Sequence, residues 1–328
     1  MTPRTMTPTM NDLQRIADVL LGAERVLLVS HVSPDGDTVG STLAILWALR
    51  AVGVPARVAC EDAIQEAGFL PGAEEYTTAP HAGEDVILGV DASDLRRLGA
   101  IVADVDFERV TLAQIDHHST NQGFAALNYV RHTAATAELA LELVRALGAP
   151  LDARIASCLL TGLVSDTRGF RTSSTTAESL GIARDLVAAG ADLGWITDAL
   201  FNHVSAASRR LWTAALTRQQ LDDGILWVAL DRALLDSLGE GEPDTRGLIG
   251  LLISFDEAQV AALFRALPEG GIDVSLRSRP GIDVGAVAYS LGGGGHPQAA
   301  GCQLPGTLEE ETPRVLAVLR RALADARR

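Results

Sequence analysis

The stretch Val26-Leu27-Leu28-Val29-Ser30-His31-Val32-Ser33-Pro34-Asp35-Gly36-Asp37-Thr38 decides the fold. A short apolar, β-branched run ends at a histidine, and a Ser-Pro-Asp-Gly turn that carries two aspartates follows. The apolar positions Leu43, Leu46 and Leu49 then predict a helix. The order strand, loop, helix is typical of a parallel sheet, in which ligands bind at the carboxyl ends of the strands.

The polar residues of this loop have two interpretations. One imidazole and two carboxylates can bind one or two divalent cations, and they cannot all be buried unpaired because isolated charges in an apolar interior are too costly. An Asp-Gly turn followed by a helix N-cap explains the same residues. The stretch alone leaves both interpretations open.

Composition limits the class of protein. A chain of 328 residues with 47% apolar content can bury a sizeable core and predicts two domains. No window approaches 18 continuous apolar residues, so no transmembrane span is predicted. Residues 1–10 are polar and lack the apolar core of a signal peptide, which predicts a disordered tail. The 3 cysteines are widely spaced, which fits a reducing cytoplasm and neither a disulfide framework nor a zinc cluster.

The charged residues narrow the function. A formal net charge of −15 argues against a surface that holds long nucleic acid, whose binding depends on many cationic phosphate contacts. The chain has no lysine, since all 27 basic residues are arginine. This excludes the P-loop lysine and the Schiff base. Arginine, which binds phosphate with two parallel hydrogen bonds, remains.

Acidic and imidazole residues follow two further apolar runs. The run 85–90 ends at Asp91, and the run 110–115 ends in Asp116-His117-His118. The apolar helix predicted over 155–167 carries Asp166 near its C-terminus, where a carboxylate opposes the helix dipole and needs a compensating cation. Because ordinary strands have no reason to gather such residues at one sheet edge, the repetition favours the metal interpretation.

Together these motifs resemble a known family. The pattern His31-x-x-x-Asp35-x-Asp37, Asp91, Asp116-His117-His118 and Asp166 is similar to the four motifs of the DHH phosphoesterase superfamily, in the same order and spacing. That superfamily includes RecJ-type exonucleases, family II inorganic pyrophosphatases and short-RNA oligoribonucleases. The resemblance implies an α/β fold, with a parallel-sheet DHH domain and flanking helices over 11–190.

The resemblance also implies residue roles. Two metal ions would share Asp91, and the implied ligands are His31, Asp35, Asp37, Asp91, His117 and Asp166. His118 would face the substrate phosphate, and Asp116 would orient the neighbouring histidine. Mixed imidazole and carboxylate ligation suits Mn²⁺, with Mg²⁺ as the alternative. Two such ions stabilise an in-line displacement at phosphorus.

The pattern changes beyond residue 190. Residues 191–216 predict a helical linker, and 217–328 predict a smaller α+β domain with a mixed sheet. We expect strands over 224–230, 259–265 and 271–277. Helices are predicted near 245–252, 284–291 and 309–324.

This second domain carries a candidate anion site. A strand ends in Arg277-Ser278-Arg279, and a run of glycines over 292–295 precedes His296. Consecutive glycines allow a ligand to approach the backbone N–H groups, although a flexible loop explains the run as well. Both segments resemble the nucleotide-binding end of the DHH-associated domain. The resemblance implies that the substrate phosphate and base contact Arg265, Arg277, Ser278, Arg279, Gly294 and His296.

The sequence therefore predicts a manganese-dependent phosphodiesterase of the short-RNA branch, which is cytoplasmic and does not bind membranes. Short RNA, linear dinucleotides and 3′-phosphoadenosine 5′-phosphate are the expected substrates. A homodimer is one option for the assembly, and the sequence leaves the oligomeric state open. A family II pyrophosphatase is an alternative, but the resemblance would place lysines in its phosphate pocket. A RecJ-like exonuclease would need a further nucleic-acid-binding domain. A non-catalytic nucleotide sensor is the alternative from another class.

Overall fold

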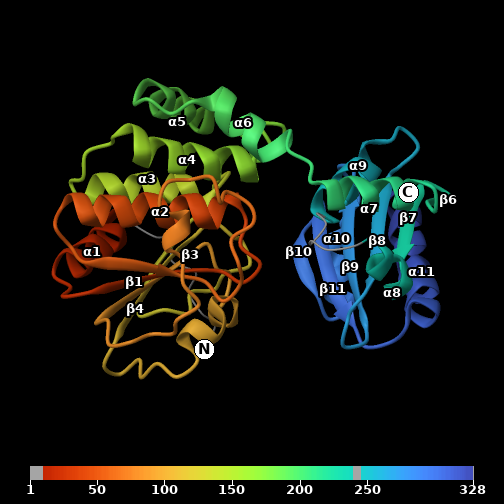
Figure 1. Cartoon of the computed structure of the whole chain (residues 1–328), viewed down its shortest axis with the longest axis horizontal. Coiled ribbons are helices and arrows are strands. Elements are labelled where there is room, and N and C mark those ends of the chain that lie inside the picture. The colour runs from red at the N-terminus through yellow and green to blue at the C-terminus, as the bar shows by residue number, and fades with distance from the viewer. Residues whose placement is uncertain (1–9, 239–244, 328) are drawn as a thin grey trace. The chain divides into compact units, whose positions relative to one another are not determined.

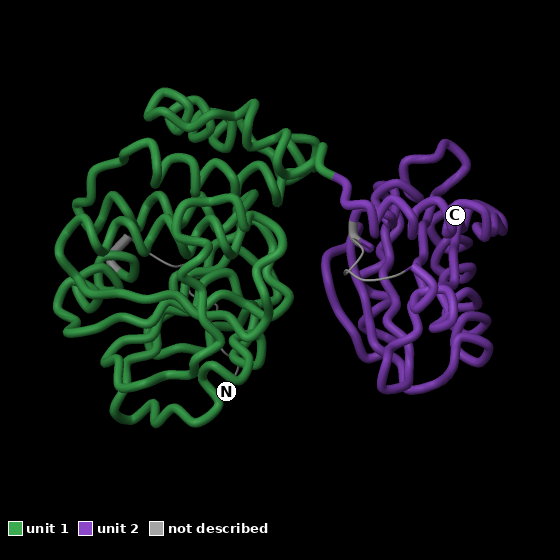
Figure 2. Tube along the Cα trace, in the orientation of Figure 1, with its two compact units in different colours: residues 1–203 green, residues 204–328 purple. Residues whose placement is uncertain are grey.

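The computed structural model describes residues 10–238 and 245–327. Of the predicted tail, residues 1–9 lie outside the described residues and Met10 is the first residue of α1 (Met10–Leu21). The chain forms two compact units, residues 1–203 and 204–328 (Figure 2). Their boundary falls within the segment 191–216. No helix among the described residues combines the length and apolar character needed to cross a membrane.

Unit 1 is built on a parallel sheet of 5 strands in the order β2-β1-β3-β4-β5 (Figure 1). This confirms the predicted parallel sheet. The central strands are buried along their whole length, as expected for a sheet covered on both faces. The sequence analysis did not identify the last strand, which mixes polar and apolar residues. The strands are β1 (Val26–Ser30), β2 (Ala56–Ala59), β3 (Val86–Val90), β4 (Thr111–Asp116) and β5 (Leu127–Val130).

Helices cover one face of this sheet in two layers. The inner layer packs against one set of alternating strand residues, which includes Val26 and Leu28, and α5 and α6 lie outside α4. On the opposite face, Leu27 and Val29 pack against the 3₁₀ segment η2 (Leu95–Val102). The helices of unit 1 after α1 are α2 (Gly36–Ala51), α3 (Thr136–Ala146), α4 (Ala153–Asp166), α5 (Ala177–Ala188) and α6 (Leu193–Phe201), and a short 3₁₀ turn η1 spans Ala73–Glu75.

Helices α2 and α4 pack closely because glycines of α2 face the backbone and side chains of α4. A Cβ atom on Gly40 would lie 2.4 Å from the Cys158 carbonyl oxygen, and one on Gly36 would lie 2.6 Å from the Ser165 Cβ. Gly36 is the first residue of α2, and Ser165 stands next to the last residue of α4. This crossing therefore brings the C-terminus of α4 to the loop that follows β1.

Unit 2 is a mixed sheet of 6 strands in the order β10-β11-β9-β8-β7-β6. It confirms the predicted mixed α+β architecture. Helices α10 and α11 pack on one face, and α7, α8 and α9 pack on the other. Its elements are α7 (Ala206–Leu216), β6 (Gln220–Asp222), β7 (Ile225–Leu230), α8 (Arg232–Ser237), α9 (Thr245–Ser254), β8 (Val260–Ala266), β9 (Ile272–Ser278), α10 (Val284–Ser290), β10 (Gly294–His296), β11 (Ala299–Leu304) and α11 (Leu308–Ala326).

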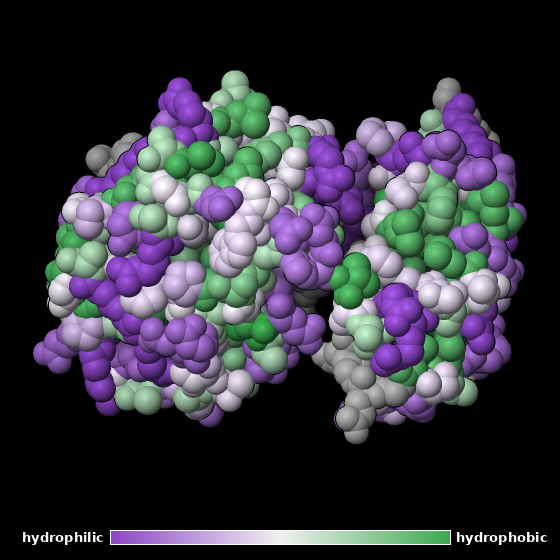
Figure 3. Space-filling view, turned by 45° about the horizontal axis from the view of Figure 1, so that its top comes forward, coloured by the Kyte–Doolittle hydropathy of each residue, from purple (hydrophilic) through white to green (hydrophobic). Residues whose placement is uncertain are grey.

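The surface mixes polar and apolar areas, as the face drawn in Figure 3 shows. In unit 1, several of the large apolar side chains that remain exposed lie on the outer helices α5 and α6. They are Leu180, Val187, Trp195 and Phe201. Scattered exposed apolar residues are ordinary for a folded protein.

The α2–α4 crossing can be tested with two glycine substitutions. Gly40→Ala should lower the free energy of unfolding by about 1–3 kcal/mol, because a methyl group has no room against the α4 backbone. The matched control is Gly181→Ala in α5, where no atom lies within 4 Å of an added Cβ. Alanine should stabilise that helix by about 0.5–1 kcal/mol. Urea denaturation measures both, and equal effects would contradict the proposed close packing.

Candidate active site

The strand register places the predicted motifs side by side. Ser30 at the end of β1 pairs with Val90 of β3, and Val90 pairs with Ile115 of β4. Because the three strands are parallel and end at one level, the next residues along each strand stand in one row at the carboxyl edge of the sheet. These residues are His31, Asp91 and Asp116.

His31 faces two carboxylates. Its Nε2 lies 3.5 Å from Asp91 Oδ2 and 3.7 Å from Asp35 Oδ1, and its Nδ1 hydrogen-bonds to the Val32 carbonyl at 2.8 Å. Burial opposes protonation of this ring, but the charges and hydrogen bonds of the two aspartates raise its pKa to about 10. An Nδ1 bond to a backbone carbonyl leaves Nε2 as the ligand atom, which is the usual arrangement of a metal-binding histidine.

His117 has the same orientation on the other side of Asp91. Its Nδ1 lies 3.1 Å from the Thr133 carbonyl, and its Nε2 lies 3.7 Å from Asp91 Oδ1 and 3.4 Å from Asp166 Oδ2. Burial opposes its protonation, yet the nearby carboxylates raise its pKa to about 10. Asp91 therefore lies between two imidazoles that present equivalent nitrogen atoms.

Asp91 itself has an unusual backbone. Its φ is 62°, in the left-handed region that non-glycine residues rarely adopt. Strain of this kind persists where the surrounding structure enforces it, and it is common at functional sites. Thr136 donates a hydrogen bond to Asp91 Oδ1 at 2.6 Å, which fixes the carboxylate in place.

Asp35 and Asp37 reconcile the two interpretations of the first loop. Asp35 is the N-cap of α2, since its side chain accepts hydrogen bonds from the backbone N–H groups of residues 37 and 38. The side chain of Asp37, in the first turn of α2, is fully buried against the N-terminus of α3. It accepts hydrogen bonds from the N–H groups of Thr136 and Ala137 at 2.6 and 3.0 Å. Both aspartates also belong to clusters of metal-binding groups, so capping and metal binding are compatible here.

Asp166 reaches the cluster from the end of α4. The pKa of Asp166 is raised to about 7, mainly by burial and also by the charges of Asp35 and Asp91, while the His117 charge opposes this rise. Burial also raises the pKa of Asp37 well above its usual range, and the charges of Asp91 and Asp166 add to this effect. Such crowded carboxylates need cations close by.

The donor set therefore fits divalent metal ions. Two groups whose donor atoms all lie within 4.8 Å of one another are His31, Asp35, Asp91 and Asp37, His117, Asp166, and a third combines Asp91, His117 and His118. Carboxylate oxygens suit Mg²⁺ and Mn²⁺, imidazole nitrogens suit transition-metal ions, and the set contains no thiolate. All six ligands implied by the resemblance are brought together.

His118 is held differently from the other two imidazoles. Its Nδ1 lies 2.7 Å from Asp116 Oδ1, and Asn121 donates to Asp116 Oδ2 at 2.7 Å. The Asn121 amide also lies within hydrogen-bond distance of the Ala92 carbonyl oxygen and of Gln114 Oε1, at 3.0 and 2.9 Å. Asn121 thus links the ends of β3 and β4 and fixes the carboxylate that orients His118.

The sequence analysis did not identify Thr136, Asn121 or Gln114 as part of the site. Thr136 follows no strand and belongs to no motif, and its role depends on where α3 packs. Asn121 stands three residues after His118, so its position in the same loop was the available signal. Gln114 reads as an ordinary strand residue, although a fully buried glutamine is itself unusual.

Unit 2 brings three of its predicted residues to one sheet face. Arg277 pairs with Ala261 of β8 and with Ala299 of β11, and Ala299 pairs with His296. Directly paired residues point to the same face, so Arg277 and His296 share it, and Arg265 lies on it by alternation. The Nε of Arg265 is buried and has no hydrogen-bond partner among the described residues, while its Nη2 lies 3.7 Å from Asp273 Oδ2.

Ser278 and Arg279 have structural contacts within unit 2. The Ser278 hydroxyl donates to the Ile282 carbonyl at 2.6 Å on the opposite sheet face, and the Arg279 guanidinium donates to the carbonyls of Ala258 and Phe255 at 2.7 and 3.0 Å. A substrate contact for either residue stays a prediction.

The glycine run combines a packing role with an open position. A Cβ on Gly293 would lie 2.2 Å from the Gly301 carbonyl oxygen, so glycine is required there for β11 to approach. An added Cβ on Gly294 would have no atom within 4 Å. Packing therefore explains why position 293 is glycine, but it does not explain the glycine at position 294.

Comparison with known proteins agrees with this fold. The model described as "DHH family, N-terminal domain" matches residues 25–163, and that described as "DHHA1 domain" matches residues 234–325. The chain belongs to the DHH phosphoesterase family and is an enzyme.

The chain is also similar to individual named proteins. The chain is 35% identical to "Bifunctional oligoribonuclease and PAP phosphatase NrnA" of Thermus thermophilus, over 96% of this chain and 95% of that protein. It is 26% identical to "Probable manganese-dependent inorganic pyrophosphatase" of Streptococcus mutans, over 52% of this chain and 57% of that protein. The fold matches the crystal structure of an exopolyphosphatase-related protein from Bacteroides fragilis, with a TM-score of 0.86, 23% identity and 98% coverage of both chains.

The metal centre can be tested directly at Asp91. Asp91→Asn removes one negative charge but tolerates the left-handed backbone, so it should fold. We expect Mn²⁺ affinity to fall by more than about tenfold, the lower bound for residues that merely support a metal site. Asp104→Asn, an exposed aspartate of unit 1, is the control. Calorimetric titration with Mn²⁺ measures both, and equal affinities would contradict a role for Asp91 as ligand.

The hydrogen bond from Thr136 to Asp91 can be removed without removing a metal ligand. Thr136→Val keeps the shape and the N–H group that bonds Asp37, but it removes the hydroxyl that bonds Asp91. Metal affinity should fall by about 10- to 100-fold, as is typical for residues that orient a ligand. Thr213→Val on α7 is the exposed control. An unchanged Mn²⁺ affinity in Thr136→Val would show that the hydroxyl does not position Asp91.

Proposed function

We propose that this protein is a manganese-dependent phosphodiesterase. It hydrolyses short oligoribonucleotides, including linear dinucleotides, to mononucleotides, and it converts 3′-phosphoadenosine 5′-phosphate to AMP. The observation that carries this proposal is the pair of buried imidazoles, His31 and His117, whose Nε2 atoms face carboxylates on both sides of Asp91. The name of the Thermus thermophilus relative, which covers almost the whole chain, supports the choice of substrates.

The residues divide into roles. His31, Asp35 and Asp91 would hold one ion, and Asp37, Asp91, His117 and Asp166 would hold the other. When bound, two divalent ions supply an activated water and neutralise charge on the phosphate. His118, held through Nδ1 by Asp116, would donate a hydrogen bond from Nε2 to a phosphate oxygen. Such preorganised donors stabilise the charge that develops in the transition state.

Manganese is preferred over magnesium for two reasons. The set mixes imidazole with carboxylate ligands, whereas Mg²⁺ is bound mainly by oxygen and keeps several waters. The Streptococcus mutans relative, which covers about half of this chain, is named as manganese-dependent. Chelation should abolish turnover, and Mn²⁺ should restore it more fully than Mg²⁺ does.

Unit 2 would contribute the contacts that select nucleotides. Arg265, Arg277 and His296 share a sheet face, and the buried Arg265 Nε lacks a partner among the residues that the structure describes. Together with Gly294, Ser278 and Arg279, they form the proposed substrate set. The cytoplasmic location and the homodimer stay predictions.

Substrate length tests the proposal. A net charge of −15 repels polyanions at long range, and this repulsion grows with the number of phosphates. RNAs of two to about four nucleotides should therefore be hydrolysed fastest. Added salt should reduce the rate for short substrates more than for long ones, because it screens repulsion while it weakens local contacts. The measurement is kcat/KM for a length series at two ionic strengths, with Asp91→Asn as the inactive control.

Three outcomes would redirect the assignment. Equal or rising kcat/KM up to long strands would favour a RecJ-like exonuclease. Faster hydrolysis of pyrophosphate than of any dinucleotide would favour a pyrophosphatase. Binding of nucleotides without hydrolysis in the presence of Mn²⁺ would favour a nucleotide sensor.

The role of unit 2 is tested at His296, which is exposed. His296→Ala should raise KM for a dinucleotide by roughly tenfold, the loss expected from one charge-assisted contact to phosphate. Its Mn²⁺ content and melting temperature should match those of the unsubstituted protein, because the residue belongs to the other unit. Loss of metal from this variant would show that the residue has been misassigned.

A further inference from the structure

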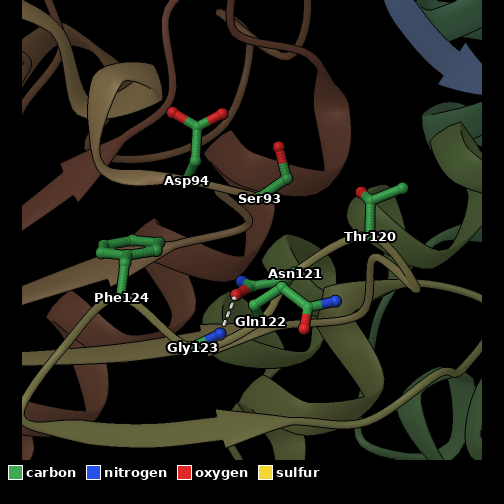
Figure 4. A pocket seen from close by; sticks show the side chains of 7 residues that line it. All are labelled: Ser93, Asp94, Thr120, Asn121, Gln122, Gly123 and Phe124. Carbon is green, nitrogen blue, oxygen red and sulfur yellow. Dashed lines mark hydrogen bonds between the residues drawn. The ribbon is translucent and has the colours of Figure 1, made fainter. Parts of the chain in front are cut away.

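A cavity of about 230 Å³ lies in unit 1 beside the candidate active site. Its walls come from the segment after β3 and from the loop after β4, which are the segments that follow Asp91 and His118. Figure 4 shows Ser93 and Asp94 on one wall and the loop of residues 120–124 opposite. The first lining residue of each segment, Ser93 and Thr120, thus lies two residues after Asp91 and His118, which would contact the metal ions and the phosphate.

Several polar groups of this cavity are available to a ligand. The hydroxyls of Ser93 and Thr120 and the amide of Gln122 have no hydrogen-bond partner among the residues that the structure describes. Asn121, by contrast, uses its amide on Ala92, Gln114 and Asp116 and accepts a bond from the Gly123 N–H at 2.7 Å. Asn121 shapes the loop, while its neighbours offer hydrogen bonds.

The lining also disfavours one class of ligand. The described lining contains neither arginine nor histidine, and its charged group is the Asp94 carboxylate. The described lining therefore offers a phosphate no cationic side chain. Phe124 packs partly against the core below the sheet, and its remaining surface lines the cavity. The cavity thus suits a neutral group with one apolar face and several hydrogen-bonding atoms.

Size limits the ligand further. The cavity is smaller than the roughly 300–1,000 Å³ of pockets that enclose drug-sized molecules. It can take a single base with its sugar but not a dinucleotide. Asp94 accepts hydrogen bonds through Oδ1 from Arg96, which leaves its second oxygen for a sugar hydroxyl. Gln122 can both donate and accept, so it can bond the edges of different bases.

We propose that this cavity is a nucleoside subsite, which holds the sugar and base of the nucleotide whose phosphate binds at the Asp91 cluster. The proposal rests on the proposed function, because it assumes a nucleotide substrate. It places a determinant of substrate choice in the same unit as the metal ligands, in addition to the arginines of unit 2. A base stacked on Phe124 would be recognised with little sequence preference, since every base has an aromatic face.

The test is a double substitution, Thr120→Val with Gln122→Ala, which removes two hydrogen-bonding groups without touching Asn121. Thr217→Val with Gln219→Ala, an exposed pair of identical spacing in unit 2, is the matched control. KM for a dinucleotide should rise about tenfold in the first variant, the loss expected from such contacts, with kcat changed less. Hydrolysis of bis(p-nitrophenyl) phosphate, which has no nucleoside, should stay within about twofold.

A binding measurement provides a second readout that does not depend on turnover. Calorimetric titration gives the affinity for AMP and for inorganic phosphate in each variant. The AMP affinity should fall about tenfold in the Thr120, Gln122 variant, while the phosphate affinity should not change. Equal losses for AMP and phosphate, or no loss relative to the Thr217, Gln219 control, would overturn the subsite. If the unsubstituted protein cleaves no dinucleotide, the proposed function fails, and the AMP-to-phosphate comparison still decides whether the cavity binds a nucleoside.

Discussion

Strands β1, β3 and β4 end at the same level of the sheet, and this shared register places His31, Asp91 and Asp116 in one row. Each residue comes from a different part of the chain, and none could reach the others if one strand were shifted. Both faces of β1 and β3 are packed, and a shift by one residue would move the side chains of each face into the other core, where they would no longer fit their neighbours. The hydrophobic core therefore determines the spacing of the candidate metal ligands.

A second constraint is the close crossing of α2 and α4. Glycines at positions 36 and 40 let the two backbones approach, and this contact carries Asp166 to the strand ends. It adds a carboxylate to a site that already holds Asp35, Asp37 and Asp91. Buried like charges raise one another's pKa, so the arrangement is stable only with compensating charge. Protonated histidines would supply that charge without metal, and bound metal ions would supply it in their place, because a ligating imidazole nitrogen carries no proton.

The sequence predicted the site residues that directly follow a strand with a clear apolar pattern. The strands that precede His31 and Asp91 were predicted because their apolar runs are continuous, and those residues then meet at the sheet edge. Thr136 could not be predicted, since its hydroxyl reaches Asp91 only through the packing of α3. β5 was missed because its four residues, Leu127–Val130, alternate between polar and apolar character too briefly to form a pattern. The crossing of α2 with α4 depends on glycines that read as ordinary helix residues.

The distribution of charge favours substrates with few phosphates. The chain is strongly acidic as a whole, and the cavity beside the active site has no cationic residue in its described lining. The candidate metal centre would attract phosphate, and so would Arg265 and Arg277 of unit 2. A ligand with few phosphates and otherwise neutral groups meets the least repulsion. Short nucleotides have this form, whereas every added phosphate of a longer strand would meet a surface of the same sign.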